Sequence, residues 1–172
     1  MIQAAQEIAR QTLAASAGFQ SLVSAGDAAT ALGRIYHDAL PKPISGRPEH
    51  TLDEITALRP CAVVYTATGP NGFVAQRDSM GDDVCWNNSG TIVIVLMRNV
   101  PDEDRNDLSL VDTDFRTIAG TIVTELIALS ETADYLVADR IEAMGPYRTA
   151  IEDLKSVGDA QSYELIVSWG GR

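Results

Sequence analysis

The sequence predicts an α+β protein with a single mixed, largely antiparallel sheet, helices packed mainly on one face, and an N-terminal helical extension. Three segments support this class: an apolar strand at 91–97, an amphipathic helix that ends at 130, and an alternating strand at 162–169. The 172 residues suffice for one domain with its own hydrophobic core. We divide it into the extension and connector at 1–50 and a core at 51–172.

The extension is expected to contain two weak helices and a short strand. Residues 2–17 place small and apolar side chains at helical spacing, and Gly18 is the expected end of this helix. Because its stripe is only thinly apolar, we expect this helix to pack at the edge of the core. Asp27 can cap a second helix that runs to Leu32, and the sequence RIYHDALP predicts a strand that ends before Pro41.

A connector and a long loop interrupt the next part of the chain. Residues 41–50 contain three prolines and a glycine, which interrupt regular structure. Residues 61–68 then predict a strand that ends at a Gly-Pro-Asn-Gly turn. Residues 72–90 are polar and rich in Gly, Asn and Asp, so we interpret them as a long loop between strands. Loops of this length are commonly functional or mobile.

The strand at 91–97 has almost no polar alternation, which is typical of a strand covered on both faces. Its two faces carry two apolar sets: Val93, Val95 and Met97 on one, and Ile92, Ile94 and Leu96 on the other. Helices on one side of the sheet would cover one set only. Two explanations stay open for the other set. The N-terminal helices cross to the second face, or another copy of the protein covers it.

The C-terminal half is expected to hold helices and a final strand. The strongest helix begins at Asp112 or Thr113 and ends at Ser130 with a wide apolar stripe. Residues 132–142 predict a further helix that a following Gly-Pro pair would end. The closing strand at 162–169 alternates, with its large apolar and aromatic side chains mostly on one face.

The composition argues against several classes of function. A net charge of −11 disfavours adhesion to nucleic acid or to an anionic membrane, since both need clustered Lys and Arg. No segment has the apolar length needed to span a bilayer, and the interrupted N-terminal stretch does not predict a signal peptide. We expect Cys61 and Cys85 to be free thiols, with one disulfide as the alternative.

No catalytic, cofactor or metal motif is evident. His37 and His50 are the two histidines, and neither a nucleophile-elbow serine motif nor a phosphate-binding glycine loop accompanies them. The acidic cluster Asp102, Glu103 and Asp104 does not match a calcium loop, because glycine and glutamate are missing at the required spacing. We interpret it as a solvated loop with acids at a helix start.

The order of elements resembles the tail-terminator family of tailed bacteriophages, the lambda-type minor tail protein U-like proteins. The resemblance covers about 59–169, through RPCAVVYTATG, TIVIVLMRNVPDED, FRTIAGTIVTELIALS, ADYLVADRIEAMGPYR and SYELIVSW. It is one of element order and local composition. Two departures are the long N-terminal stretch and the segment IEDLKSVG, which is more helical in pattern than the family suggests.

The resemblance implies a structural virion protein and no enzymatic activity. Members form a ring, usually of six copies, that caps the head-proximal end of the tail tube and stops its polymerisation. Implied partners are further copies, the tail tube protein, a head-completion or connector protein and, as a further candidate, a sheath protein. DNA would pass through the lumen without specific binding, and assembly would take place in the host cytoplasm, away from membranes.

The interface candidates are acidic and aromatic: Asp82, Asp83, Trp86, Asp102, Glu103, Asp104 and Trp169. The loop around Asp82 is our candidate for the lumen, and the same loop with Trp86 is our candidate for tube contact. The loop at 102–104 would face the head. Trp86 is either folded back on the core or held out as an anchor for a partner, and both interpretations stay open.

Two other functions stay open. The first is a different neck protein, such as a head-completion or connector protein. The second is a small cytosolic enzyme or ligand-binding domain with a site near His37.

Overall fold

The structure, a computed structural model, describes residues 2–43, 46, 49–67, 74–80, 83–100, 108–131, 137–149 and 160–171. Its helices are α1 (Ile2–Ala15), α2 (Ala17–Leu22), α3 (Ala28–Leu32), α4 (Leu52–Leu58) and α5 (Leu108–Ser130). Its strands are β1 (Ile35–His37), β2 (Cys61–Thr66), β3 (Val74–Met80), β4 (Asp83–Asn99), β5 (Val137–Thr149) and β6 (Ala160–Gly171).

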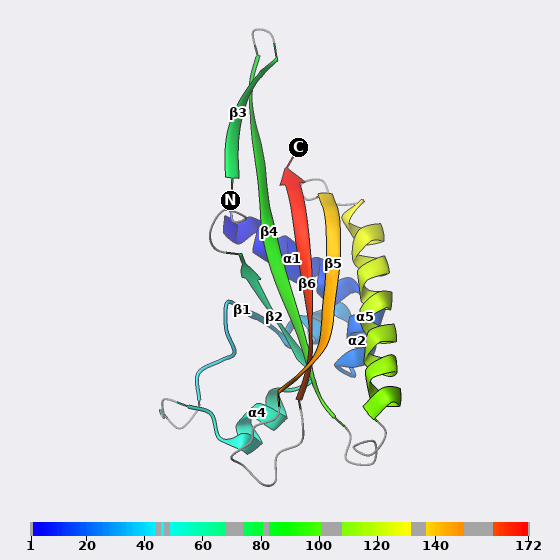
Figure 1. The fold of residues 1–172 in the computed structure, drawn as a ribbon. Coiled ribbons are helices and arrows are strands. Elements are labelled where there is room, and N and C mark those ends of the chain that lie inside the picture. The colour runs from blue at the N-terminus through cyan, green and yellow to red at the C-terminus, as the bar shows by residue number, and fades with distance from the viewer. Residues whose placement is uncertain are drawn as a thin grey trace.

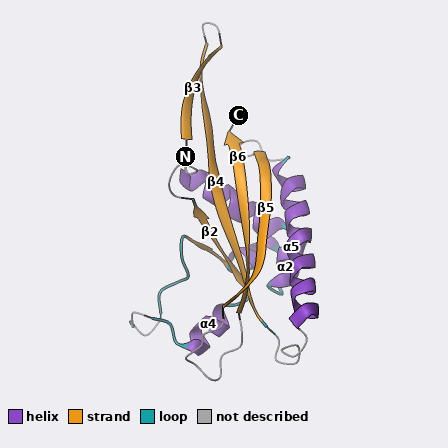
Figure 2. Cartoon of the chain, in the orientation of Figure 1, coloured by secondary structure: helices purple, strands orange, loops and turns teal. Residues whose placement is uncertain are grey.

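One mixed sheet forms the centre of the fold. In the described part of the chain its strand order is β1-β2-β4-β6-β5, with β3 paired to β4 outside this path. The β1–β2 pair is parallel, and the other described pairs are antiparallel. Helices α1, α2 and α5 pack on one face, which we call the first face; Figure 1 looks onto the opposite, second face. Figure 2 shows the same separation of helices from strands. The predicted α+β class with helices mainly on one face is confirmed.

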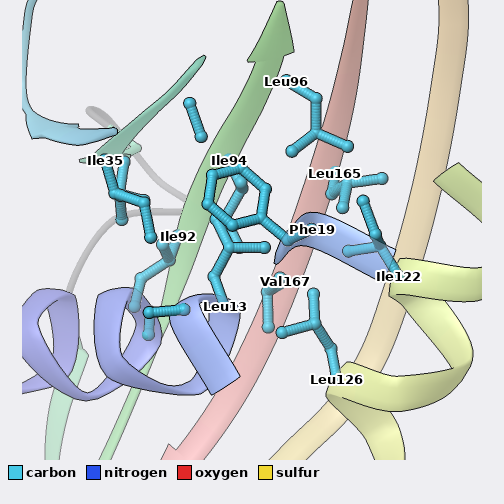
Figure 3. Close-up of a cluster of buried hydrophobic side chains, with 14 of the residues drawn as sticks. Leu13, Phe19, Ile35, Ile92, Ile94, Leu96, Ile122, Leu126, Leu165 and Val167 are labelled. Atoms are coloured by element: carbon cyan, nitrogen blue, oxygen red, sulfur yellow. The ribbon is translucent and has the colours of Figure 1, made fainter. Parts of the chain in front are cut away.

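The hydrophobic core lies between the first face and these helices (Figure 3). The strands contribute Ile35, Ile92, Ile94, Leu96, Leu165 and Val167, and the helices contribute Leu13, Phe19, Ile122 and Leu126. Burial of each large apolar side chain stabilises the fold by about 1.5–3 kcal/mol. The N-terminal extension therefore shares the core of the rest of the chain.

The expectation of a peripheral N-terminal helix is wrong. Leu13 and Phe19 are fully buried, because small residues such as Ala5 and Ala9 let α1 lie close to the sheet. The helix also ends earlier, and Ser16 caps α2 by accepting a hydrogen bond from the N–H of Phe19. Gly18 does not end a helix but lies inside α2.

The polar segment at 72–90 is not a loop throughout. Residues 74–80 form β3, which pairs with the first half of β4 from Met80 opposite Asp83 to Val74 opposite Ser89. Residues 74–80, VAQRDSM, lack the apolar and polar alternation of a strand with one buried face. Hydrophobic periodicity therefore gave no signal for these strands.

The predicted helix at 132–142 is also wrong. Residues 137–149 form β5, which pairs with β6 along its whole length. A register shift between Ala138 and Arg140 places Ala138 and Ile141 together against the core, three positions apart. This bulge imitates helical spacing. The Gly-Pro pair lies at a second register shift inside the strand, and residues 132–136 and 150–159 lie outside the described residues.

Helices α3 and α4 each begin at a capping residue. Asp27 caps α3 by accepting from the N–H of Thr30, as expected. Helix α4 was missed, although its capping box of Thr51 and Glu54 is visible in the sequence. Helix α5 begins four residues before Asp112, so neither Asp112 nor Thr113 is its cap.

Candidate interaction surfaces

The second face of the sheet carries the other apolar set of the central strand. Its register brings Val95 of β4 between Val63 of β2 and Glu164 of β6, and Val93 between Tyr65 and Ile166. These residues are absent from the core that the helices form. Since α1 and α2 pack on the first face, the explanation in which the N-terminal helices cross to the second face is not what the structure shows.

The second face is unevenly covered. Helix α4 lies at its Asn99 end, where the side-chain amide of Asn99 donates to the carbonyl of Thr56 over 3.1 Å. Val93 is only 7% exposed, whereas Val95 and Ile166 are half-buried. At the β5 edge, Met144 is 42% exposed. An apolar strip thus crosses β2, β4 and β6 and becomes more exposed toward β5. Glu164 interrupts it between Val95 and Met144.

Charged and phenolic groups border this strip. Arg140 and Glu142 of β5 form an ion pair of 3.0 Å in which both side chains are exposed, so it contributes little to stability. Burial raises the pKa of Tyr65, and the negative charge of Glu164 raises it further. The second face therefore combines a β-branched apolar strip with interspersed polar groups, which resembles the composition of protein interfaces.

A two-stranded ribbon projects from the body of the sheet (Figures 1 and 2). It consists of β3 and residues 83–89 of β4, and only residues 88 and 89 also pair with β6. In the described part of the chain, residues 83–87 therefore have a strand partner on one side only, and so does β3. Isolated two-stranded ribbons are marginally stable in water. Free strand edges are also ready positions for pairing with another chain.

The structure places the predicted interface residues in three different settings. Asp83 opens β4 opposite Met80, and Trp86 lies opposite Arg77, so both belong to the ribbon. Trp169 is 5% exposed and lies in the core, close to the backbone of Gly90. The remaining candidates, Asp82, Asp102, Glu103 and Asp104, lie outside the described residues.

A polar cluster that sequence reasoning missed anchors the start of α5. Arg98 of β4 donates from Nε to the amide oxygen of Gln161 (3.0 Å) and from a terminal guanidinium nitrogen to Asp114 (2.7 Å). Gln161 is fully buried and donates in turn to Asp112 over 2.6 Å. The guanidinium also lies 4.5 Å from the centre of the Phe115 ring. The sequence feature that could have indicated this cluster is Arg98, an arginine at the end of an apolar strand.

His37 belongs to a surface cluster with structural partners. Its Nε2 lies 2.8 Å from a guanidinium nitrogen of Arg10 and 3.3 Å from the carboxylate of Glu7. Arg10 also donates to the carbonyl of Ile35, which ties α1 to β1. A hydrogen bond from Gln11 and the charge of Arg10 lower the pKa of Glu7. The cluster is explained by attachment of α1 to the sheet edge.

Two hollows of about 260 Å³ each are present in the described structure. One lies between the connector and α4, with Lys42, His50 and Glu54 in its wall. The other is bordered by Leu22, Arg98 and Ile118 among others. Neither has His37 in its lining.

Within the described ranges, no three His, Cys, Asp or Glu side chains gather closely enough to hold a metal ion. None of the described helices has the length and apolarity to cross a membrane. Compared with protein-family models and with curated proteins, the sequence matches none.

Proposed function

We propose that this protein is a phage tail terminator, whose copies form a ring on the head-proximal end of the tail tube. The ring stops further tube polymerisation and provides the surface on which the head is joined. The observation that supports this proposal most strongly is the second face of the sheet. Its half-buried apolar residues Val95 and Ile166 belong to no helix-covered core, which is typical of a surface shared with a neighbouring copy.

The ribbon supplies a second argument, because it is suited to contact with the tube. It extends away from the sheet, and its backbone has hydrogen-bonding groups available at both outer edges in the described residues. Strand addition at such an edge gives affinity through the main chain, while side chains set the choice of partner. Trp86 lies in this ribbon, beyond the pairs that β4 makes with β2 and β6. We therefore favour its interpretation as an anchor for the tube protein.

The charge of the chain suits a conduit for DNA. Each copy has a net charge of −11, and a ring multiplies this charge around one lumen. Phosphates are repelled by carboxylates, so DNA would slide past the wall without binding to it. The proposed mechanism needs no bond chemistry. One side of the ring binds the last tube ring, and the other side does not repeat the surface that a further tube ring would need.

Electron microscopy of negatively stained tail tubes tests this function. Purified protein is added to growing tubes, with bovine serum albumin as the matched control. We expect one ring at one end of each tube and an arrest of elongation. Tubes that keep growing without a terminal ring would refute the proposal. Rings that bind isolated heads but not tubes would instead favour a head-completion or connector protein.

A further inference from the structure

The outer face of α5 is exposed but carries no charge along most of its length. Between residues 117 and 130 the one charged residue is Glu125. The exposed positions of this stretch form what we call the α5 outer face: Thr117, Gly120, Thr121, Thr124, Ile127 and Ala128. Charged residues make up 22% of the chain, and the solvent face of a helix is usually their preferred place. Their depletion is characteristic of the centre of an interface.

The single carboxylate of this stretch is used inside the protein. Glu125 Oε2 accepts a hydrogen bond from the N–H of Gly18 over 2.9 Å and from the hydroxyl of Ser16 over 2.5 Å. Both donors belong to the start of α2, which packs beside α5. Glu125 is therefore held toward α2 and does not add a charge to the α5 outer face.

The hydroxyl groups on the α5 outer face are satisfied within the helix. Thr117 donates to the carbonyl of Thr113, Thr121 to that of Thr117, and Thr124 to that of Gly120, at 2.9 to 3.1 Å. Their hydrogen-bond donors are thus occupied, and a partner could cover these residues without leaving hydroxyl protons unpaired. Ile127 adds a large apolar side chain that is 42% exposed.

The partner must tolerate contact with a strongly acidic protein. Two copies that each carry −11 repel each other, so a contact between copies is least costly where one of the two surfaces is uncharged. On the second face, Glu164 is the register partner of Val95, and Glu142 is the register partner of Ile166. The α5 outer face brings no further carboxylate to this surface.

The arrangement of layers also matches the two surfaces. Phe115, Ala119, Ile122 and Leu126 of α5 are directed into the core on the first face, so the α5 outer face is directed away from the sheet. Figure 1 looks onto the second face, with α5 beside β5 at the edge of the sheet. Copies stacked in one direction would place the α5 outer face of each on the second face of the next, and would complete a helix–sheet–helix sandwich.

We propose that the α5 outer face of one copy docks on the apolar strip of the second face, around Val95 and Ile166, of a neighbouring copy. This contact is heterologous, because each copy uses two different surfaces, and a heterologous contact closes into a ring when its rotation permits. The inference rests on the proposed function for the ring itself and adds which surfaces build it. If the second faces of two copies packed against each other instead, both copies would use the same surface. No further copy could then be added, and no ring would form.

Disulfide cross-linking tests the contact with two mixed proteins that each carry one introduced cysteine in addition to the buried Cys61. One preparation carries Thr124→Cys and the other Ile166→Cys, both in a Cys85→Ser background, and each is oxidised with and without tail tubes. We expect covalent dimers only when the two preparations are mixed. Dimers in the Ile166→Cys preparation alone would overturn the inference in favour of a two-fold contact. Absence of cross-links in every sample, with both proteins folded by circular dichroism, would also overturn it.

A charge substitution provides an independent test. Thr124→Glu should lower the fraction of tube ends that carry a ring by about tenfold or more, because it places a carboxylate against Glu164 and Glu142 of the second face. Ala29→Glu, at an exposed position of α3, makes the same charge change and should leave the fraction unchanged. Unchanged rings with Thr124→Glu would overturn the inference, while the terminator function would stand. Mixed cross-links in concentrated protein that never caps a tube would support the contact and refute the terminator function.

Discussion

The carboxylate of Glu125 in α5 accepts a hydrogen bond from the backbone N–H of Gly18 in α2, at 2.9 Å. The same oxygen accepts from the hydroxyl of Ser16, which itself caps α2. One side chain therefore joins two helices that are more than a hundred positions apart in the sequence. The junction holds α2 against α5 and keeps the α5 outer face free of charge.

Removal of this carboxylate should destabilise the fold. For Glu125→Ala we expect the free energy of unfolding to fall by about 1–3 kcal/mol, since two partly buried donors lose their acceptor. Glu131→Ala removes an exposed carboxylate just beyond the same helix and should change it by less than about 0.5 kcal/mol. Urea unfolding followed by circular dichroism measures both. Equal effects of the two substitutions would contradict the role assigned to Glu125.

Two glycines should respond in opposite directions to the same substitution. A Cβ at Gly18 would lie 3.1 Å from Cγ1 of the fully buried Ile122, so Gly18→Ala should destabilise the fold by about 1 kcal/mol or more. A Cβ at Gly120 would meet nothing within 4 Å, so Gly120→Ala should stabilise α5 by about 0.5–1 kcal/mol. Thermal unfolding of the two variants measures the difference. A stabilising Gly18→Ala would show that α2 and α5 are less closely packed than described.

These contacts explain why parts of the fold were predictable and others were not. Strands β2 and β6 and the central part of β4 border the core, so their apolar residues follow the strand pattern. The same holds for α5, whose buried residues follow the helical pattern. Strand β5 escaped detection because the bulge near Ala138 shifts its apolar positions. The helix predicted at 2–17 was expected at the edge of the core, because the close packing that small residues such as Ala5 and Ala9 permit cannot be seen in the sequence pattern.

The candidate site was predictable only in outline. The polar composition of 72–90 indicated an excursion with Trp86, and the structure shows a projecting ribbon there. Trp169 looked equally suitable in sequence, but its strand position turns it into the core beside Gly90. The second face was anticipated from the absence of polar alternation around Val93. Which face the helices cover depends on packing, and the periodicity of one strand does not determine it.

Burial of Cys61 should make stability depend on alkaline pH. Desolvation raises the pKa of its thiol to about 11, from the value of 9.0 expected in solvent. Between these values the unfolded chain loses the proton more readily than the folded chain, so the free energy of unfolding should fall as the pH rises from 9 to 11. Burial also raises the pKa of Tyr36 and Tyr65, which adds to the fall above pH 10.

Urea titrations at several pH values, compared between the parent and Cys61→Ala, measure this contribution. The substitution should flatten the decline between pH 9 and 11 even though it lowers stability overall by opening a small cavity. In a Cys85→Ser background, the remaining thiol should react with a thiol-specific reagent only as fast as the protein unfolds. Rapid labelling of the folded protein at pH 8 would contradict the burial of Cys61.

The ribbon should be dispensable for folding and essential for tube binding. Ala75 and Asn88 are register partners, so an Asn-Gly turn can join them directly in place of residues 76–87. Within the described pairs the removed strands pair only with each other, and we expect the free energy of unfolding to change by less than about 1 kcal/mol. Capping of tail tubes, counted by electron microscopy, should be lost. Trp86→Ala in the intact ribbon is the matched point variant and should weaken capping without abolishing the ribbon. A shortened protein that still caps tubes would show that the tube contact lies elsewhere on the body.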